Sequence, residues 1–145
     1  MKKPSERLQA VLMLAKLRQQ QAAEQLASAI RAAQQQQQQI EQLQSFQQEY
    51  NNQFAESASA GASASQLKNH QTFYGKLDAA VSSQQSQLAA GSAQLDRARE
   101  LWQLHYSKQK NMTELVAKKR QLEQQAEEKQ QQREQDDRTL QKPII

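Results

Sequence analysis

Residues 8–54 read LQAVLMLAKLRQQQAAEQLASAIRAAQQQQQQIEQLQSFQQEYNNQF, and a seven-residue repeat in this stretch decides the fold. One heptad position holds Leu12, Gln19, Leu26, Ala33, Ile40, Gln47 and Phe54, and the other holds Leu8, Ala15, Ala22, Ala29, Gln36, Leu43 and Tyr50. Eleven of these fourteen residues are apolar. A spacing of 3.5 residues keeps one stripe of a helix facing a partner helix. The stretch predicts a long helix over about residues 5–54, weakly packed where Ala fills the stripe.

The following segment, about residues 55–65, changes character and predicts a turn. It consists of Ala and Ser with Gly61 near its centre, and Glu56 is its only charge. Ser side chains compete with the helical backbone for hydrogen bonds and favour helix caps. Ser63, followed three residues later by Gln66, has the pattern of a capping box that starts a second helix.

The repeat resumes after this turn and predicts a second helix over about residues 66–140. One heptad position holds Leu67, Tyr74, Val81, Leu88, Leu95, Trp102, Gln109 and Val116, and the opposite position is less apolar. Folding back near residue 60 sets Leu43 opposite Leu77 and Leu8 opposite Met112. The sequence predicts an all-α protein, a single domain over residues 1–145 in which two long helices form an antiparallel coiled-coil hairpin. We expect its seam to include Leu8, Leu12, Leu26, Ile40, Leu88, Leu95, Trp102 and Met112.

Composition excludes several other classes of protein. The 145 residues include 32 Gln and 21 Ala, but only three Val, four Ile and no Cys. Ala and Gln are good helix formers, whereas sheets are rich in β-branched residues. Without Cys there are no disulfides or thiolate metal sites. The longest apolar run, Ala10 to Ala15, is too short to cross a bilayer. The amino-terminal residues lack the apolar core of a signal peptide, so we expect a cytoplasmic protein.

The sequence predicts no catalytic, cofactor-binding or metal-binding residues, and no small-molecule substrate. Catalysis needs converging groups in a cleft, and a two-helix hairpin has none. His70 and His105 are roughly 50 Å apart on a continuous helix, so we expect each to be a seam or surface residue. The net charge of +4 leaves nucleic-acid binding as a minor alternative. Because no segment has a dense block of Lys and Arg, we expect no nucleic-acid partner.

Aromatic residues gather on both sides of the predicted turn. Five of the seven in the chain lie there: Phe46, Tyr50, Phe54, Phe73 and Tyr74. Phe46 and Phe73 fall beside the heptad core positions, where a two-helix coil cannot bury them fully. Exposed aromatic side chains are typical anchors of protein interfaces. A patch across both helices is therefore predicted, with partial burial against Gln side chains as the alternative.

The same region resembles the FliJ family of flagellar type III export proteins. The first helix ends in Phe46-Gln47-Gln48-Glu49-Tyr50, the second begins with Asn69-His70-Gln71-Thr72-Phe73, and Trp102 follows. The family has an aromatic-Gln-x-Glu-Tyr ending, an Asn-aromatic-Gln-x-Phe opening and a Trp further on. His70 departs from that pattern, because it stands where an aromatic residue is usual. Only the stretch from about Gln39 to Trp102 carries residues that are specific to this family.

The resemblance implies a non-enzymatic component of the export apparatus, with a fold similar to the γ stalk of rotary ATPases. It implies three partners: the hexameric export ATPase (FliI-like), the cytoplasmic region of the export gate (FlhA-like) and chaperones of filament substrates. The ATPase ring would hold the terminal end of the hairpin. The hairpin would promote assembly of the ring and its hydrolysis of ATP. The gate would bind a patch that maps to Gln39, Leu43, Phe46, Tyr50, Phe73, Leu77, Ala80 and Gln84. The implied place is the cytoplasm, peripheral to the inner membrane at the flagellar base.

Two alternatives to this interpretation stay open. One is the related stalk of a virulence type III secretion system, which the residues do not distinguish from a flagellar one. The other is a generic coiled-coil scaffold that dimerises and has no motor partner. A scaffold of that kind forms a parallel coil between two chains, whereas a hairpin packs its own seam.

Overall fold

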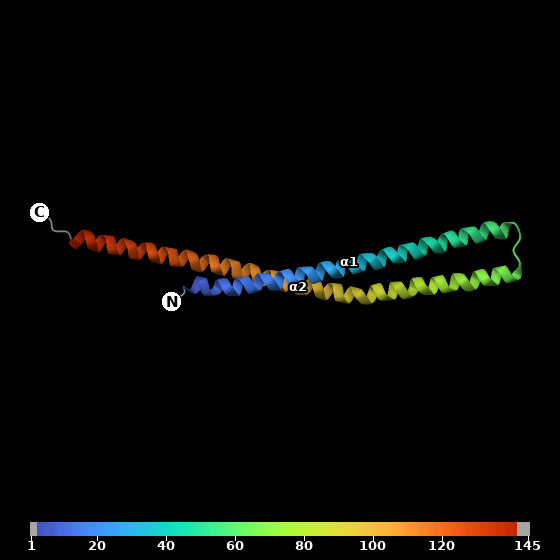
Figure 1. The fold of residues 1–145 in the computed structure, drawn as a ribbon, viewed down its shortest axis with the longest axis horizontal. Helices are drawn as coiled ribbons and strands as arrows, with labels where there is room; N and C mark the ends of the chain where they lie inside the picture. Colours follow the sequence, from blue (N-terminus) through green and yellow to red (C-terminus); the bar gives the residue numbers. More distant parts are fainter. Residues whose placement is uncertain (1–2, 142–145) are drawn as a thin grey trace. The chain divides into compact units, whose positions relative to one another are not determined.

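The computed structural model describes residues 3–141 and consists of two long helices. Helix α1 spans Pro4–Ser59 and α2 spans Ala64–Gln141 (Figure 1). The helices pack against each other, and residues 3–141 contain no strand. The expected all-α fold of two long paired helices is therefore confirmed.

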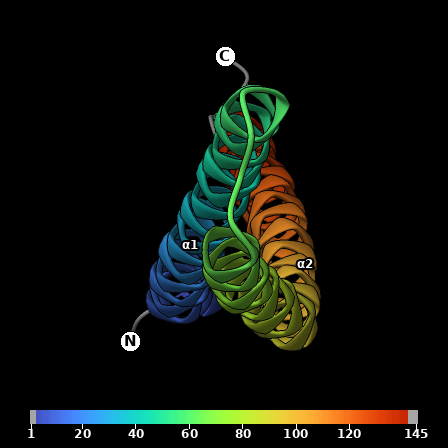
Figure 2. The ribbon, with the colours of Figure 1, turned by 90° about the vertical axis from the view of Figure 1, so that its right-hand side faces the viewer.

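The connection between the helices is short and is held by local hydrogen bonds. Figure 2 looks onto this turn, where it joins the ends of α1 and α2. Gly61 has a φ of 104°, in the left-handed region that glycine adopts without a steric penalty. The Ser63 hydroxyl accepts a hydrogen bond from the Gln66 amide at 3.1 Å, and the Gln66 side chain accepts one from the Ser63 amide at 3.0 Å. This is the predicted capping box.

Helix α1 extends further than the sequence pattern suggests. It continues through Ala55–Ser59, a stretch that we expected to belong to the turn. The heptad stripe ends at Phe54, but Ala sustains a helix without needing a seam. The Ser59 hydroxyl is satisfied locally, since it donates to the Glu56 carbonyl at 2.7 Å. The turn is therefore only the four residues between Ser59 and Ala64.

The chain packs as two units. The turn unit comprises Glu24–Glu100, which includes the turn and the helical segments on either side of it. The terminal unit comprises the residues before Glu24 and after Glu100, where the first part of α1 packs on α2. The expectation of a single domain stays a prediction.

A narrow line of heptad residues forms the core of each unit. In the turn unit Ile40 is 2% exposed and Val81 is 6% exposed. In the terminal unit Leu12, Ala22 and Val116 are buried. All five belong to the heptad positions identified in the sequence. The other expected seam residues are half-buried: Leu8, Leu26, Leu88, Leu95, Trp102 and Met112. None of the described large side chains is fully buried, so the core is thin.

The middle of the seam is under-filled in the turn unit. A small hollow of about 120 Å³ is lined by Ala29, Ala32, Ala33, Gln36, Leu88, Gly91 and Gln94. A Cβ added to Gly91 would lie 3.8 Å from the Gln36 side-chain oxygen, an ordinary contact distance. The hollow is present because the Ala and Gly side chains on both helices are too small to fill it. These residues therefore bury little apolar area at the seam.

We predict that Ile40→Ala destabilises the turn unit by about 2–5 kcal/mol. The change truncates a buried side chain, and the core contains few other buried side chains. Urea denaturation followed by far-UV circular dichroism measures the loss. Leu67→Ala serves as the control, because Leu67 is 46% exposed and its truncation should cost much less. Equal losses for the two variants would show that the seam does not carry the stability.

Candidate functional site

A cluster of stacked rings joins α1 to α2 in the turn unit. The His70 ring lies 3.8 Å from the Phe54 ring and 5.0 Å from the Tyr50 ring, stacked on both. Phe73 meets Tyr50 edge to face at 4.7 Å, and Tyr74 lies 6.0 Å from His70. Aromatic pairs at these distances stabilise by about 0.5–1.5 kcal/mol beyond the area that they bury. The cluster therefore fixes the two helices against each other near the turn.

His70 is the buried centre of this ring cluster. It is 8% exposed, and its Nδ1 atom has no hydrogen-bond partner. Tyr50 and Phe54 both stack on it, so the imidazole packs here as an aromatic ring. This explains how His70 fills a position where the family pattern has an aromatic residue.

Two phenylalanines at the edge of the ring cluster are partly exposed at the surface. Phe46 is 48% exposed and Phe73 is 40% exposed. Half-buried Tyr50 connects them, since it stacks on Phe46 at 6.5 Å and meets Phe73 at 4.7 Å. Phe46, Tyr50 and Phe73 thus form a continuous aromatic patch across both helices. Contact with half-buried Tyr50 restrains both exposed rings, which suits an interface anchor.

The other residues predicted for the gate-binding patch also lie in the turn unit. Leu43, Leu77 and Gln84 are half-buried, whereas Gln39 and Ala80 are exposed. The Gln84 side-chain oxygen is buried and has no hydrogen-bond partner. Beside them, Gln47 of α1 donates to Asp78 of α2 at 3.4 Å. The ring contacts bring Phe46, Tyr50 and Phe73 together, and the gate-binding role of the whole set stays a prediction.

A polar clamp in the terminal unit holds the start of α1 on α2. Glu123 accepts hydrogen bonds from the Ser5 amide at 3.0 Å and from the Ser5 hydroxyl at 2.5 Å. Lys3 forms an ion pair with Glu127, and Arg120 donates to Gln9 at 2.6 Å. The carboxylate of Glu123 therefore caps the amino terminus of α1, where anions are favoured by the helix dipole.

The clamp also corrects the predicted register. A fold-back near residue 60 places Met112 opposite Leu8, but Ser5 and Gln9 contact residues about two helical turns further along α2. The turn unit is offset in the same direction, since Gln47 bonds to Asp78. A heptad repeat matches equally well when one helix advances by seven residues, so the repeat alone does not fix this register.

The hydrogen bonds of the clamp change the ionisation of its groups. The two bonds from Ser5 lower the pKa of Glu123 below its ordinary value. The bond from Lys3 to Glu127, with the attraction between their charges, raises the pKa of Lys3. Because the pKa of Glu123 is lower in the folded state than in the unfolded state, its ionised carboxylate stabilises the fold fully at pH values above the unfolded pKa. That contribution is lost as the pH falls through the folded pKa.

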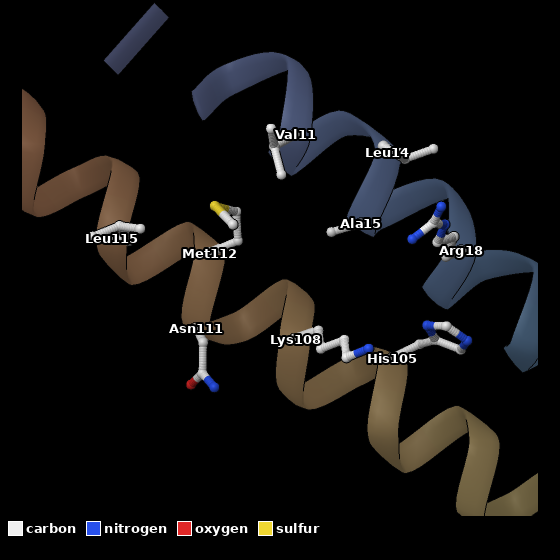
Figure 3. A pocket seen from close by; sticks show the side chains of 9 residues that line it. All are labelled: Val11, Leu14, Ala15, Arg18, His105, Lys108, Asn111, Met112 and Leu115. Atoms are coloured by element: carbon white, nitrogen blue, oxygen red, sulfur yellow. The ribbon is translucent and has the colours of Figure 1, made fainter. Parts of the chain in front are cut away.

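An apolar groove in the terminal unit was not predicted from the sequence. It has a volume of about 350 Å³. Its walls are Val11, Leu14, Ala15 and Arg18 of α1, with His105, Lys108, Asn111, Met112 and Leu115 of α2. Figure 3 shows Val11 and Met112 pointing toward one another across the groove. Arg18, Lys108 and His105 lie together at the end away from Val11 (Figure 3).

The groove belongs to a region that is rich in exposed apolar side chains. Eight of the exposed large hydrophobic residues of the described chain lie here: Val11, Met13, Leu14, Leu17, Leu101, Leu104, Tyr106 and Leu115. The signal in the sequence is the apolar run from Ala10 to Ala15. Six consecutive apolar residues cannot all face one seam of a helix, so some of them must reach the surface.

No metal site or membrane-spanning helix is found in the part of the chain that the structure describes. There, no three His, Cys, Asp or Glu side chains converge closely enough to hold a metal ion. Neither described helix contains a segment long and apolar enough to span a bilayer.

These features define a class of protein: paired helices that carry interaction surfaces on their flanks. Within this class, the model of the flagellar FliJ protein family matches residues 4–144, and the chain belongs to that family. The family is a component of flagellar type III export. It points to the flagellar base as the place of action. Comparisons with curated proteins and with solved structures found no match.

We predict that Glu123→Gln loosens the first turn of α1 at neutral pH, because the amide accepts these hydrogen bonds more weakly than the carboxylate. Amide hydrogen exchange of residues 5–9 should be faster in the variant at pH 7. The difference should vanish at low pH, where Glu123 of the unchanged protein is protonated. Glu134→Gln, in the tail of α2, is the control. Equal protection of the unchanged protein and Glu123→Gln at pH 7 would contradict the cap.

Proposed function

We propose that this chain acts in flagellar type III export as a stalk between the export ATPase and the export gate. In this proposal it binds the FliI-like ATPase hexamer and promotes ring assembly and ATP hydrolysis. It also binds the cytoplasmic region of the FlhA-like gate and receives chaperones of filament substrates. Its place is the cytoplasm, peripheral to the inner membrane. The family match and the helical pairing support this proposal.

The aromatic patch is the observation that carries the contact with the gate. Phe46 and Phe73 together expose apolar rings from two different helices, and Tyr50 links them. Burial of such rings by a partner removes apolar area from water, while the rings are already held in position. A partner with a matching apolar pocket therefore gains affinity at low conformational cost. Phe46, Tyr50 and Phe73 are among the residues for which the resemblance implies gate binding, and this agreement supports the proposal.

The tail of α2 supports the proposed contact with the ring. Beyond Val116 the described residues are exposed, apart from half-buried Glu123, and most are Gln, Glu, Lys or Arg. A polar helix without an apolar stripe gains little from burial against any one wall. It therefore suits insertion into a ring pore in which it does not become fixed in one position. The clamp at Ser5 and Glu123 holds the two helices together at the base of this tail.

We predict that Phe46→Ala combined with Phe73→Ala weakens binding to the gate region by more than tenfold, since interface anchors contribute about 2 kcal/mol or more. Isothermal titration against the purified cytoplasmic region measures the affinity. Helicity should not change, because the buried seam residues Ile40 and Val81 are left in place. Tyr106→Ala removes an aromatic ring that is 45% exposed in the terminal unit, and it should bind like the unchanged protein. Unchanged affinity of the double variant would exclude the patch as the gate contact.

A further inference from the structure

Most of the apolar groove of the terminal unit is lined from two stretches of positive charge. Between residues 7 and 23 of α1 the cationic residues are Arg7, Lys16 and Arg18, and no Asp or Glu occurs. Between residues 101 and 113 of α2 the cationic residues are Lys108 and Lys110, again without Asp or Glu. The whole α1 wall and most of the α2 wall therefore come from positively charged stretches, and Leu115 of the α2 wall follows Glu114, which is not among the lining residues.

Apolar and cationic side chains are arranged side by side in the groove. Val11, Leu14, Met112 and Leu115 supply apolar walls, and Val11 and Leu14 are 47% and 46% exposed. Arg18 and Lys108 both line the same groove, and no carboxylate is among its lining residues. An apolar groove between two neighbouring helices is a surface on which an amphipathic helix can bind with its apolar face inward. Met112 adds a flexible side chain that adapts to the shape of an incoming one.

We propose that this groove binds an amphipathic helix of a partner protein whose apolar stripe is bordered by Asp or Glu. Side chains three and four residues apart on that helix are neighbours and enter the hollow together. The carboxylates beside them meet Arg18 and Lys108, which favours acidic partners and rejects basic ones. This surface is separate from the aromatic patch of the turn unit and from the polar clamp. The inference therefore does not rest on the proposed ATPase and gate contacts.

A second copy of the chain is a poorer occupant of the groove. Two copies whose grooves meet in the same direction place Arg18 and Lys108 of one against Arg18 and Lys108 of the other, and two that meet in opposite directions leave these cations against the apolar end of the partner. Like charges facing across an interface are destabilising, and no carboxylate in the lining of the groove relieves them. An acidic helix from a different protein has no such conflict.

The test is a display library of helical peptides of about 18 residues, five helical turns. All members share a Leu stripe, and the flanking positions carry Glu, Gln or Lys in equal amounts. Selected against the full chain, peptides with Glu flanks should be enriched at least tenfold over those with Lys flanks. Leu14→Gln with Leu115→Gln should abolish the enrichment. Both Leu side chains are at least 40% exposed, so these changes should leave the circular dichroism spectrum unchanged.

Charge reversal separates the groove from the net charge of the protein. Arg18→Glu with Lys108→Glu should invert the preference, so that peptides with Lys flanks are enriched. Lys68→Glu with Lys76→Glu makes the same change in net charge within the turn unit and should leave the preference for Glu. The proposal is overturned if the flanks show no preference, or if the preference survives reversal in the groove. It is also overturned if light scattering shows a dimer that Leu14→Gln with Leu115→Gln dissociates.

Discussion

The burial of one apolar stripe between α1 and α2 is the interaction on which the rest of the structure depends. Ile40, Val81, Leu12 and Val116 lie in this stripe, and few other side chains are as well buried. A seam of this width buries none of the described large side chains fully. It also leaves apolar side chains on the flanks of the helices, because two helices cannot cover them. Interaction surfaces are therefore a direct consequence of the fold.

The heptad repeat is sufficient to predict most of the fold. Val81 and Val116 share one heptad position, Leu12 and Ile40 share another, and the structure buries all four. The capping box at Ser63 is equally local, since two side chains and two amides within four residues define it. The end of α1 is less predictable, because Ala near the turn is compatible with both a helix and a loop. Only the hydrogen bonds around Gly61 decide where the helix stops.

The surfaces are harder to predict from the sequence than the seam. The aromatic patch is visible because Phe46 and Phe73 stand beside core positions in a chain with few aromatic residues. The contribution of His70 is not visible in the sequence, because the heptad periodicity does not show that two rings stack on its imidazole. The clamp and the groove depend on how far α2 has advanced relative to α1 in the terminal unit. The heptad repeat does not determine that offset, because an advance of seven residues preserves the repeat; the bonds of Glu123 to Ser5 show where it ends.

The two units offer surfaces of different chemistry, which suits a protein that connects several partners. The most direct test is the ATP hydrolysis rate of the cognate export ATPase as the purified chain is titrated into it. The account predicts a saturable rise that ends near one chain per ATPase hexamer. No change in rate, with an ATPase shown to form rings, would contradict the proposed stalk and leave a scaffold that contacts the gate alone.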